Sequence, residues 1–233
     1  MEVIGLPALR DNYIWLIKQG QQVVIVDPSE SHSVLHYLEV NQLEPIGIFI
    51  THGHDDHIAG VTAILEKYPS LFVKAPIEVV HLATQVVKES DQFELWGNTV
   101  EIIKTAGHTS EHISFIVDKK LFCGDALFSA GCGRVFTKDY AEKFAALQKI
   151  SQLDDSIEVY AGHEYTVTNL RFANEQEPMN QAIATALAQA QQLRAENQPT
   201  LPTTIGKERA INLFLQATTV EAFKQLRDLR DKF

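Results

Sequence analysis

Four side chains of metal-binding type lie close together in the run from Thr51 to His57. They are His52, His54, Asp56 and His57, and they follow an apolar stretch at 46–50 that predicts a buried strand. Imidazole and carboxylate groups together suit zinc, iron or manganese. The end of a strand is a rigid support at a surface where chemistry is often placed. A polar loop with histidines gathered by chance is the weaker explanation of so dense a group.

The spacing within the run indicates two metal ions rather than one. His52 and His54 are two residues apart, so in an extended segment both side chains point to the same side. Asp56 and His57 are adjacent and do not easily join that pair on one ion. A helix after Asp55, which the segment 58–68 favours, would turn them toward a second ion.

Three more predicted strands end at a glycine followed by a potential ligand. Glycine allows the backbone to turn sharply and to approach closely at these positions. Three histidines could bind one ion, an aspartate with two histidines could bind the other, and a further carboxylate could bridge the two ions. These sets are His52, His54 and His108; Asp56, His57 and His163; and Asp125. With a water added, both shells keep the open positions of a catalytic site.

This ligand pattern resembles the metallo-β-lactamase superfamily. Within it, the stretches 11–15, 124–134, 163–166 and 201–215 are similar to the bacterial type of the glyoxalase II (hydroxyacylglutathione hydrolase) family. The resemblance spans nearly the whole chain. It implies an α/β fold, the αββα sandwich, for a catalytic domain over residues 1–165. It also implies a small C-terminal α-helical domain over residues 166–233 that binds substrate.

The resemblance also implies a reaction. Glyoxalase II hydrolyses S-D-lactoylglutathione and related 2-hydroxyacyl glutathione thioesters to D-lactate and glutathione, the second step of methylglyoxal detoxification. Two divalent ions, foremost zinc with iron or manganese as alternatives, would activate a water to hydroxide that attacks the thioester carbonyl. Asp56 and Asp125 are the expected catalytic carboxylates. A thiol leaves with a pKa of about 8.5, so no strong general acid is required.

The resemblance implies that three arginines and one tyrosine contact the substrate. Arg134 lies in a glycine-rich loop, and Arg227 and Arg230 share one face of a C-terminal helix because they are three residues apart. Guanidinium forks suit the carboxylates of glutathione. The alternative is ordinary surface charge for each arginine. For Tyr165, beside a predicted ligand, the alternative is core packing.

The hydrophobic pattern predicts the elements that position these residues. Strands are expected at 2–6, 12–18, 22–27, 46–51, 71–75, 99–104, 112–117, 121–125 and 157–161, and helices at 32–40, 58–68, 140–151, 181–197 and 218–233. The last helix would open on a capping box formed by Thr218 and Glu221. Strands mixed with helices predict sheets packed face to face with helices outside.

Composition limits the remaining function classes. A net charge of −10 disfavours nucleic-acid binding by a basic surface. No run approaches the roughly 18 apolar residues of a membrane span, and the first residues lack the pattern of a signal peptide. Cys123 and Cys132 give no disulfide framework. We therefore expect a cytoplasmic protein without nucleic acid or membrane as partner. The resemblance implies a monomer that acts on a small glutathione thioester.

Other functions of the same fold remain alternatives. A persulfide dioxygenase with one iron would leave Asp56 and His57 idle, and several β-lactamases have cysteine where Asp125 stands. An RNA-processing hydrolase would favour a basic surface. A metal-binding module without activity conflicts with the open ligand shells. Some positions depart from the residues common in the glyoxalase II family, namely Gly53, Asp55, Glu111, Ala126 and Thr137.

Overall fold

The N-terminal half of the chain forms a six-stranded mixed sheet. The computed structural model describes all residues from 1 to 233. The strands follow one another in chain order: β1 (Glu2–Ala8), β2 (Asn12–Gln19), β3 (Gln22–Val26), β4 (Glu44–Phe49), β5 (Phe72–Ala75) and β6 (Gln85–Val86). Strand β2 pairs antiparallel with both β1 and β3, whereas the pairs from β3 through β6 are parallel. Parallel neighbours need crossover connections, which here contain α1 (His32–Val40), α2 (Asp55–Ile58), α3 (Val61–Lys67) and the 3₁₀ turn η1 (Ile77–Val79).

The second sheet also has six strands. Its order is β12 (Thr203–Thr204), β11 (Glu158–Ala161), β10 (Lys120–Gly124), β9 (Ile113–Val117), β8 (Asn98–Lys104) and β7 (Gln92–Leu95). Only β10 and β11 run parallel, and α4 (Tyr140–Ser151) crosses between them. The remaining helices are α5 (Thr166–Gln176), α6 (Gln181–Ala195), α7 (Ile205–Ile211), α8 (Leu213–Gln216) and α9 (Val220–Arg230).

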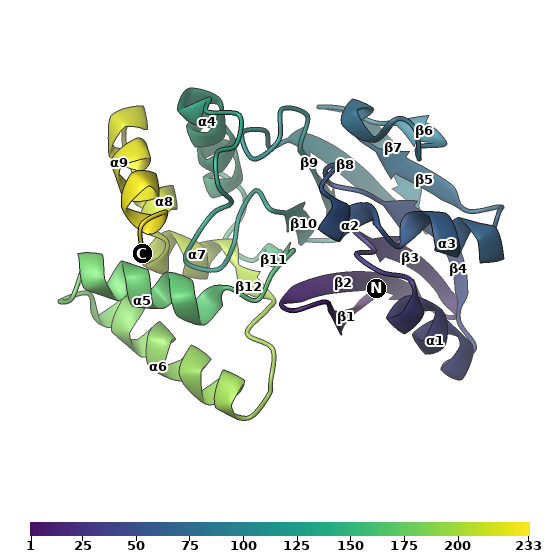
Figure 1. Cartoon of the computed structure of the whole chain (residues 1–233), viewed down its shortest axis with the longest axis horizontal. Helices are drawn as coiled ribbons and strands as arrows, with labels where there is room; N and C mark the ends of the chain where they lie inside the picture. The colour runs from purple at the N-terminus through teal and green to yellow at the C-terminus, as the bar shows by residue number, and fades with distance from the viewer.

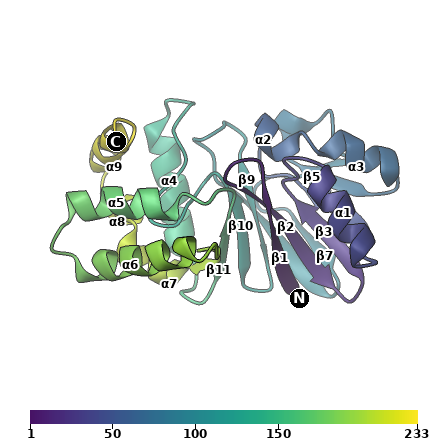
Figure 2. The same cartoon turned by 60° about the horizontal axis from the view of Figure 1, so that its bottom comes forward.

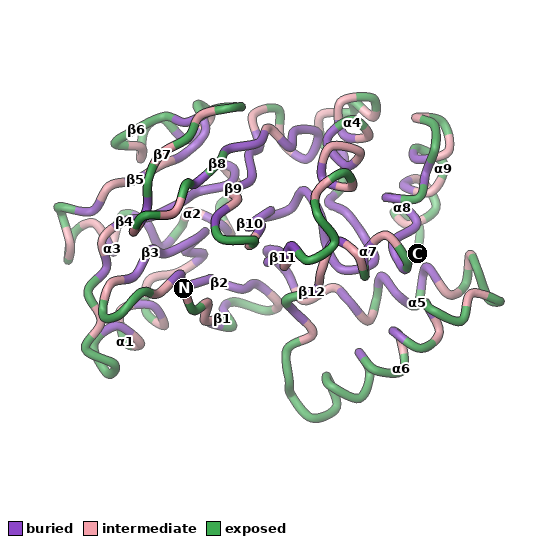
Figure 3. The backbone as a smooth tube through the Cα atoms, turned by 180° about the vertical axis from the view of Figure 1, so that it is seen from behind, coloured by how far each residue is buried: buried purple, intermediate pink, exposed green.

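The two sheets lie face to face between two layers of helices. Figure 1 and Figure 2 show α1, α2 and α3 outside the first sheet, and α4 with the C-terminal helices outside the second. The burial pattern in Figure 3 follows these layers, because the strands are largely buried while the outer turns of α6 are exposed. This is the αββα sandwich with added C-terminal helices that the sequence predicted.

Hydrophobic packing ties the C-terminal helices to the sandwich. The largest cluster contains 35 buried residues and includes Phe115 and Phe122 of the second sheet together with Phe214 of α8 and Phe223 of α9. A second cluster of 16 buried residues lies under α1 and α3. Since the aromatic side chains of α8 and α9 belong to the main core, these helices are fixed relative to the strand ends of the second sheet.

The observed elements correct several details of the prediction. The helix expected at 58–68 is shorter: α3 begins at Val61, and a separate short helix, α2, precedes it. Between them the Gly60 amide donates to the Pro28 carbonyl oxygen at 2.9 Å instead of to a carbonyl of the same helix. The last helix is capped by Thr219 rather than Thr218: the Thr219 hydroxyl accepts from the Ala222 amide at 3.1 Å. That helix ends at Arg230. Helices α5, α7 and α8 and the short strands β6, β7 and β12 were not predicted.

Candidate active site

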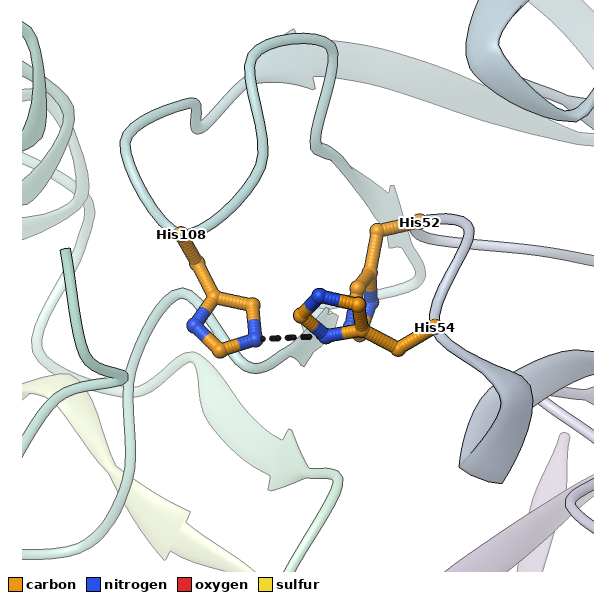
Figure 4. Close-up of side chains that lie close together, drawn as sticks. All are labelled: His52, His54 and His108. Carbon is orange, nitrogen blue, oxygen red and sulfur yellow. Dashed lines mark hydrogen bonds between the residues drawn. The ribbon is translucent and has the colours of Figure 1, made fainter. Parts of the chain in front are cut away.

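Three histidine rings converge where β4 and β8 lead into loops. His54 Nδ1 lies 3.1 Å from His52 Nε2 and 3.0 Å from His108 Nε2. Figure 4 shows the three rings turned toward one another from two separate loops, His52 and His54 on one and His108 on the other. The nitrogens are therefore within the reach of a single metal ion, as the sequence predicted for this set.

Hydrogen bonds to the Nδ1 atoms of His52 and His108, which face away from the group, fix the tautomer of each ring. His108 Nδ1 lies 2.9 Å from the carbonyl oxygen of Arg134, which only accepts, so this nitrogen donates. The Thr51 hydroxyl donates to Asp27 at 2.7 Å and accepts from His52 Nδ1 at 3.0 Å. The inner Nε2 atoms of both rings are then unprotonated acceptors. Burial lowers the pKa of His52, and it lowers that of His108 to about 4, so both rings stay neutral and ready to bind a cation.

A second group brings together Asp56 and His57, at the start of α2, with His163, which follows β11. His163 Nε2 lies 3.4 Å from Asp56 Oδ2, and His57 Nε2 lies 3.9 Å from the same oxygen. The short helix α2 provides the turn that the sequence predicted for Asp56 and His57. The structure thus assembles the second predicted set on one spot, beside the first.

Asp125 lies between the two groups. Its Oδ1 is 3.3 Å from His57 Nε2 and 3.4 Å from His163 Nε2, whereas its Oδ2 is 3.3 Å from His108 Nε2. One carboxylate oxygen thus faces each group. This is the placement expected of a bridging ligand.

The second group attracts positive charge. Burial alone would lower the pKa of His163, but the nearby carboxylates of Asp125 and Asp56 raise it to about 10. His57 behaves alike: the carboxylates of Asp125 and Asp27 outweigh its burial and raise its pKa. Despite burial, these two histidines hold the pKa of Asp125 well below its usual range. Without a metal ion, protons supply the positive charge that the carboxylates require.

The residues present fit two divalent metal ions. The buried atoms His57 Nε2 and Asp125 Oδ1 have no hydrogen-bond partner, although buried polar atoms are normally satisfied. Both atoms are of types that bind first-row metal ions, and they lie 3.3 Å apart. Imidazole nitrogens with carboxylate oxygens are the donors expected for divalent ions of this kind.

Three acidic residues that the sequence analysis did not select hold the predicted ligands or their loops in place: Asp11, Asp27 and Glu78. Asp27 accepts from His57 Nδ1 at 3.0 Å, and Asp11 lies 2.9 Å from His163 Nδ1. Each contact leaves the Nε2 atom of its histidine for the metal. Asp27 directly follows β3, so the strand-end rule used for the ligands would have found it. Asp11 is harder to find from the sequence, because it lies at a turn before a strand and not directly after one.

Glu78 joins the two loops that bear the three-histidine group. Its carboxylate accepts from the Gly53 amide at 3.0 Å, from the Thr109 hydroxyl at 2.7 Å and from the Glu111 amide at 3.2 Å. Gly53 lies between two ligands, and Thr109 follows a third. No spacing in the sequence pairs Glu78 with these loops, since they are 25 to 33 residues apart along the chain.

A close backbone approach packs the glycine-rich loop onto the site. A Cβ on Gly133 would lie 2.1 Å from the Asp125 carbonyl oxygen and 2.8 Å from His108 Nδ1, so only glycine fits there. Behind the same segment, the fully buried Lys143 of α4 donates to the carbonyl oxygen of Ala126 at 2.8 Å. The backbone at Asp125 and Ala126 is thus fixed from two sides.

His112 and the two cysteines are structural. His112 is fully buried, its Nδ1 lies 3.0 Å from the Thr105 hydroxyl, and its Nε2 accepts from the Asp125 amide at 3.2 Å. It therefore supports Asp125 and joins neither group of predicted ligands. Cys123 and Cys132 are free and buried, and burial raises the pKa of the Cys123 thiol to about 12.

A cavity of about 680 Å³ opens onto both groups. The four residues predicted to contact substrate all line it, together with the exposed ring of Phe136, which packs edge-on to His54 at 5.6 Å between ring centroids. They are Arg134, Tyr165, Arg227 and Arg230. The cavity therefore presents cations and aromatic rings beside the ligand groups.

These four side chains differ in how exposed they are and in how many contacts the protein makes with them. Arg134 is 62 % exposed and lies 3.5 Å from Asp231, whereas Arg227 is 4 % exposed and donates to the Cys132 carbonyl oxygen at 2.8 Å. Arg230 donates to Asn169 at 3.1 Å. The Tyr165 ring stacks on His163, with 4.7 Å between centroids. Arg134 is thus the freest of the three arginines, and Arg227 also holds the glycine-rich loop.

Comparison with known proteins agrees with this geometry. A family profile described as the metallo-beta-lactamase superfamily matches residues 8–163, and one described as the hydroxyacylglutathione hydrolase C-terminus matches residues 164–233. No helix has the length and apolar character needed to cross a membrane.

Relatives match the chain over its full length. A protein of Glaesserella parasuis named hydroxyacylglutathione hydrolase is 46% identical over 234 residues, and one of the same name from Haemophilus ducreyi is 47% identical, each match covering 100% of both chains. The crystal structure of ETHE1 from Myxococcus xanthus shares the fold, with a TM-score of 0.75 at 22% identity over 98% of this chain and 90% of that one. The chain therefore belongs to the metallo-β-lactamase superfamily and, within it, to the hydroxyacylglutathione hydrolase family.

Proposed function

We propose that the protein hydrolyses S-D-lactoylglutathione and related 2-hydroxyacyl glutathione thioesters to the hydroxy acid and glutathione. One observation carries the proposal. Two ligand groups joined by Asp125 face a cavity that also exposes Arg134 and Arg230, so a thioester and a carboxylate of one molecule find their partners side by side. The names of the full-length relatives support the same substrate.

We assign the metal ligands as the sequence predicted. His52, His54 and His108 would hold one divalent ion, Asp56, His57 and His163 would hold the other, and Asp125 would be shared between them. When bound, such ions acidify a water and polarise a carbonyl oxygen. Zinc suits the set best among common metals, while iron and manganese accept the same donors.

Asp56 has a second role in this proposal. Its side chain is 42 % exposed and lines the cavity, unlike the buried histidines around it. A hydrogen bond from His163 holds the pKa of Asp56 well below its usual range, so the carboxylate stays ionised. It therefore accepts a hydrogen bond from the attacking water and orients it. The departing thiolate needs no acid residue, because the pKa of a thiol is only about 8.5.

The remaining residues position the substrate. Arg134 and Arg230 bind the glycine carboxylate of glutathione, Tyr165 lines the wall beside His163, and Arg227 contacts the substrate from the same helix as Arg230 while it holds the loop. We also propose that residues 1–165 form the catalytic domain and residues 166–233 the substrate-binding domain. The protein would act as a monomer in the cytoplasm, where two free cysteines persist.

The test compares two thioesters on metal-loaded protein. S-D-lactoylglutathione should turn over rapidly, and a lactoyl thioester of a small thiol without the peptide should turn over poorly. A persulfide dioxygenase would instead consume oxygen with glutathione persulfide, and the convergence of Asp56, His57 and His163 argues against its single iron. Metal-loaded protein that hydrolyses neither thioester would refute the proposed function.

A further inference from the structure

Arg10 lies where two cavities meet. It stands at the turn between β1 and β2, after the exposed Leu9, whose φ is 49°. One of the cavities is the metal-facing one, and the other is a neighbouring groove of about 890 Å³ between this turn and the end of α6. Both are lined by Arg10, Asp11, Glu164 and Thr168. A molecule that extends from the metal-facing cavity into the groove must pass Arg10.

The Arg10 side chain has no partner within the chain. It is exposed, and its guanidinium makes neither a hydrogen bond nor an ion pair. The other cations of the two cavities each have a partner. Arg227 and Arg230 donate to Cys132 and Asn169, and Arg194 donates to the Gln198 carbonyl oxygen at 2.8 Å. Arg134, although exposed, is paired with Asp231 at 3.5 Å. Arg10 is therefore the cation with all its donors available to a ligand.

The backbone at this turn is anchored to the ligand groups. The Asp11 carbonyl oxygen accepts from the Glu164 amide at 2.8 Å, and the Asn12 side chain donates to the Asp56 carbonyl oxygen at 3.0 Å. The Asp11 carboxylate lies 2.9 Å from His163 Nδ1. The turn is thus fixed before substrate arrives, so only the Arg10 side chain must be ordered on binding.

Acidic side chains lie beside Arg10 in the groove. Asp11, Glu30 and Glu164 line the groove beside Arg10, so both signs of charge occur there. Figure 1 shows the β1–β2 turn beside the start of α5, while α9, which bears Arg227 and Arg230, lies on another side of that helix. Glutathione also has two unlike ends. Its glycine end carries only a carboxylate, whereas its γ-glutamyl end carries a carboxylate and an ammonium group.

We propose that Arg10 binds the γ-glutamyl carboxylate of the glutathione thioester, with the neighbouring acidic side chains facing its ammonium group. This inference rests on the proposed function, and it makes Arg10 a determinant of specificity for the complete tripeptide. Arg134 and Arg230 take the glycine end, so the thioester between the two ends is held over the ligand groups.

The test combines one substitution with one truncated substrate. The substitution is Arg10→Gln, and its matched control is Arg171→Gln, since Arg171 is an exposed arginine of α5 that lines neither cavity. The substrates are S-D-lactoylglutathione and the S-D-lactoyl thioester of N-acetylcysteinylglycine, which lacks the γ-glutamyl residue. The N-acetyl group prevents transfer of the acyl group from sulfur to the amine.

Arg10→Gln should raise the KM for S-D-lactoylglutathione about fivefold, as expected for one exposed ion pair. The kcat should not change, because the contact is remote from the thioester and equal in the ground and transition states. The same variant should match the wild type on the truncated thioester, and Arg171→Gln should match it on both. An equal loss on both substrates, or no loss on either, would overturn the role of Arg10.

Binding separates this inference from the proposed function. If the wild type hydrolyses neither thioester, the proposed function fails, while calorimetry with glutathione and with N-acetylcysteinylglycine still decides the role of Arg10. Weaker binding of glutathione alone to Arg10→Gln supports the γ-glutamyl contact. Equal affinity of the wild type and the variant for glutathione overturns it.

Discussion

Replacing Asp27 by asparagine should weaken one metal site more than the other. The Asp27 carboxylate is buried, with 3 % exposure, and accepts from His57 Nδ1 at 3.0 Å and from the Thr51 amide and hydroxyl at 2.8 and 2.7 Å. An asparagine keeps the oxygen for the Thr51 amide but presents an NH₂ group to His57. The ring then accepts at Nδ1 and carries its proton on Nε2, where the metal should bind.

The magnitude follows from these contacts. Loss of a carboxylate behind a metal-binding histidine typically lowers metal affinity about 10- to 100-fold. Two hydrogen bonds to a buried charge are lost as well, so the free energy of unfolding of the metal-free protein should fall by about 1–3 kcal/mol. The three-histidine group is affected less, because Asp27 reaches His52 only through the Thr51 hydroxyl.

A stepwise titration with cobalt against a chromophoric chelator measures both affinities. His54→Ala removes one site and so identifies which step belongs to which group. Thr51→Val is the matched control: it breaks the link to His52 and leaves the contact between Asp27 and His57, so its larger loss should fall on the other step. Equal losses in both steps for Asp27→Asn, or wild-type affinity in both, would refute the reasoning.

Three further outcomes are expected. Asp125→Asn should lower metal content and hydrolysis together, measured by elemental analysis and thioester turnover, because its two oxygens face different groups; full loading with normal turnover would contradict the bridge. Glu78→Ala should lower metal affinity about tenfold in chelator competition, since it frees the loops at Gly53 and Thr109; unchanged affinity would show that the loops hold without it. The third concerns pH: in metal-free protein the pKa of His163 is raised from 6.5 to about 10, so the stability that its protonated ring contributes is complete below pH 6.5 and is lost as pH rises toward 10. Urea unfolding of chelator-treated protein across this range checks the sign, and stability that rises instead would contradict it.

The sequence predicted the residues of the candidate site better than the acidic residues that hold them in place. All seven predicted ligand residues follow strand ends, and a strand end is recognisable from local apolar patterning. The supporting acids join segments far apart in the chain, such as Asp11 and His163 at a separation of 152 residues. Such contacts depend on how the two sheets pack, which no local pattern reveals.

The same limit explains the errors in the fold. The helix predicted at 58–68 is interrupted at Gly60, whose amide donates to the carbonyl oxygen of Pro28, a residue outside the segment. Helices α7 and α8 are short and derive their stability from tertiary packing of side chains such as Phe214, so their sequences carry weak helical periodicity. Long, amphipathic segments such as α4 were predicted with the bounds observed, because their pattern is complete within the segment.

The candidate metal site draws its ligands from both sheets, the first contributing His52, His54, Asp56 and His57 and the second His108, Asp125 and His163. An unfolded chain holds these residues apart and binds the ions poorly. Binding by the folded form alone adds about 4 kcal/mol when free metal exceeds the dissociation constant a thousandfold. Since proteases act on the opened chain, metal supply would set how long each molecule survives as well as how fast it works. Metal starvation would then deplete the enzyme itself, and restored supply would require new synthesis before activity recovered in full.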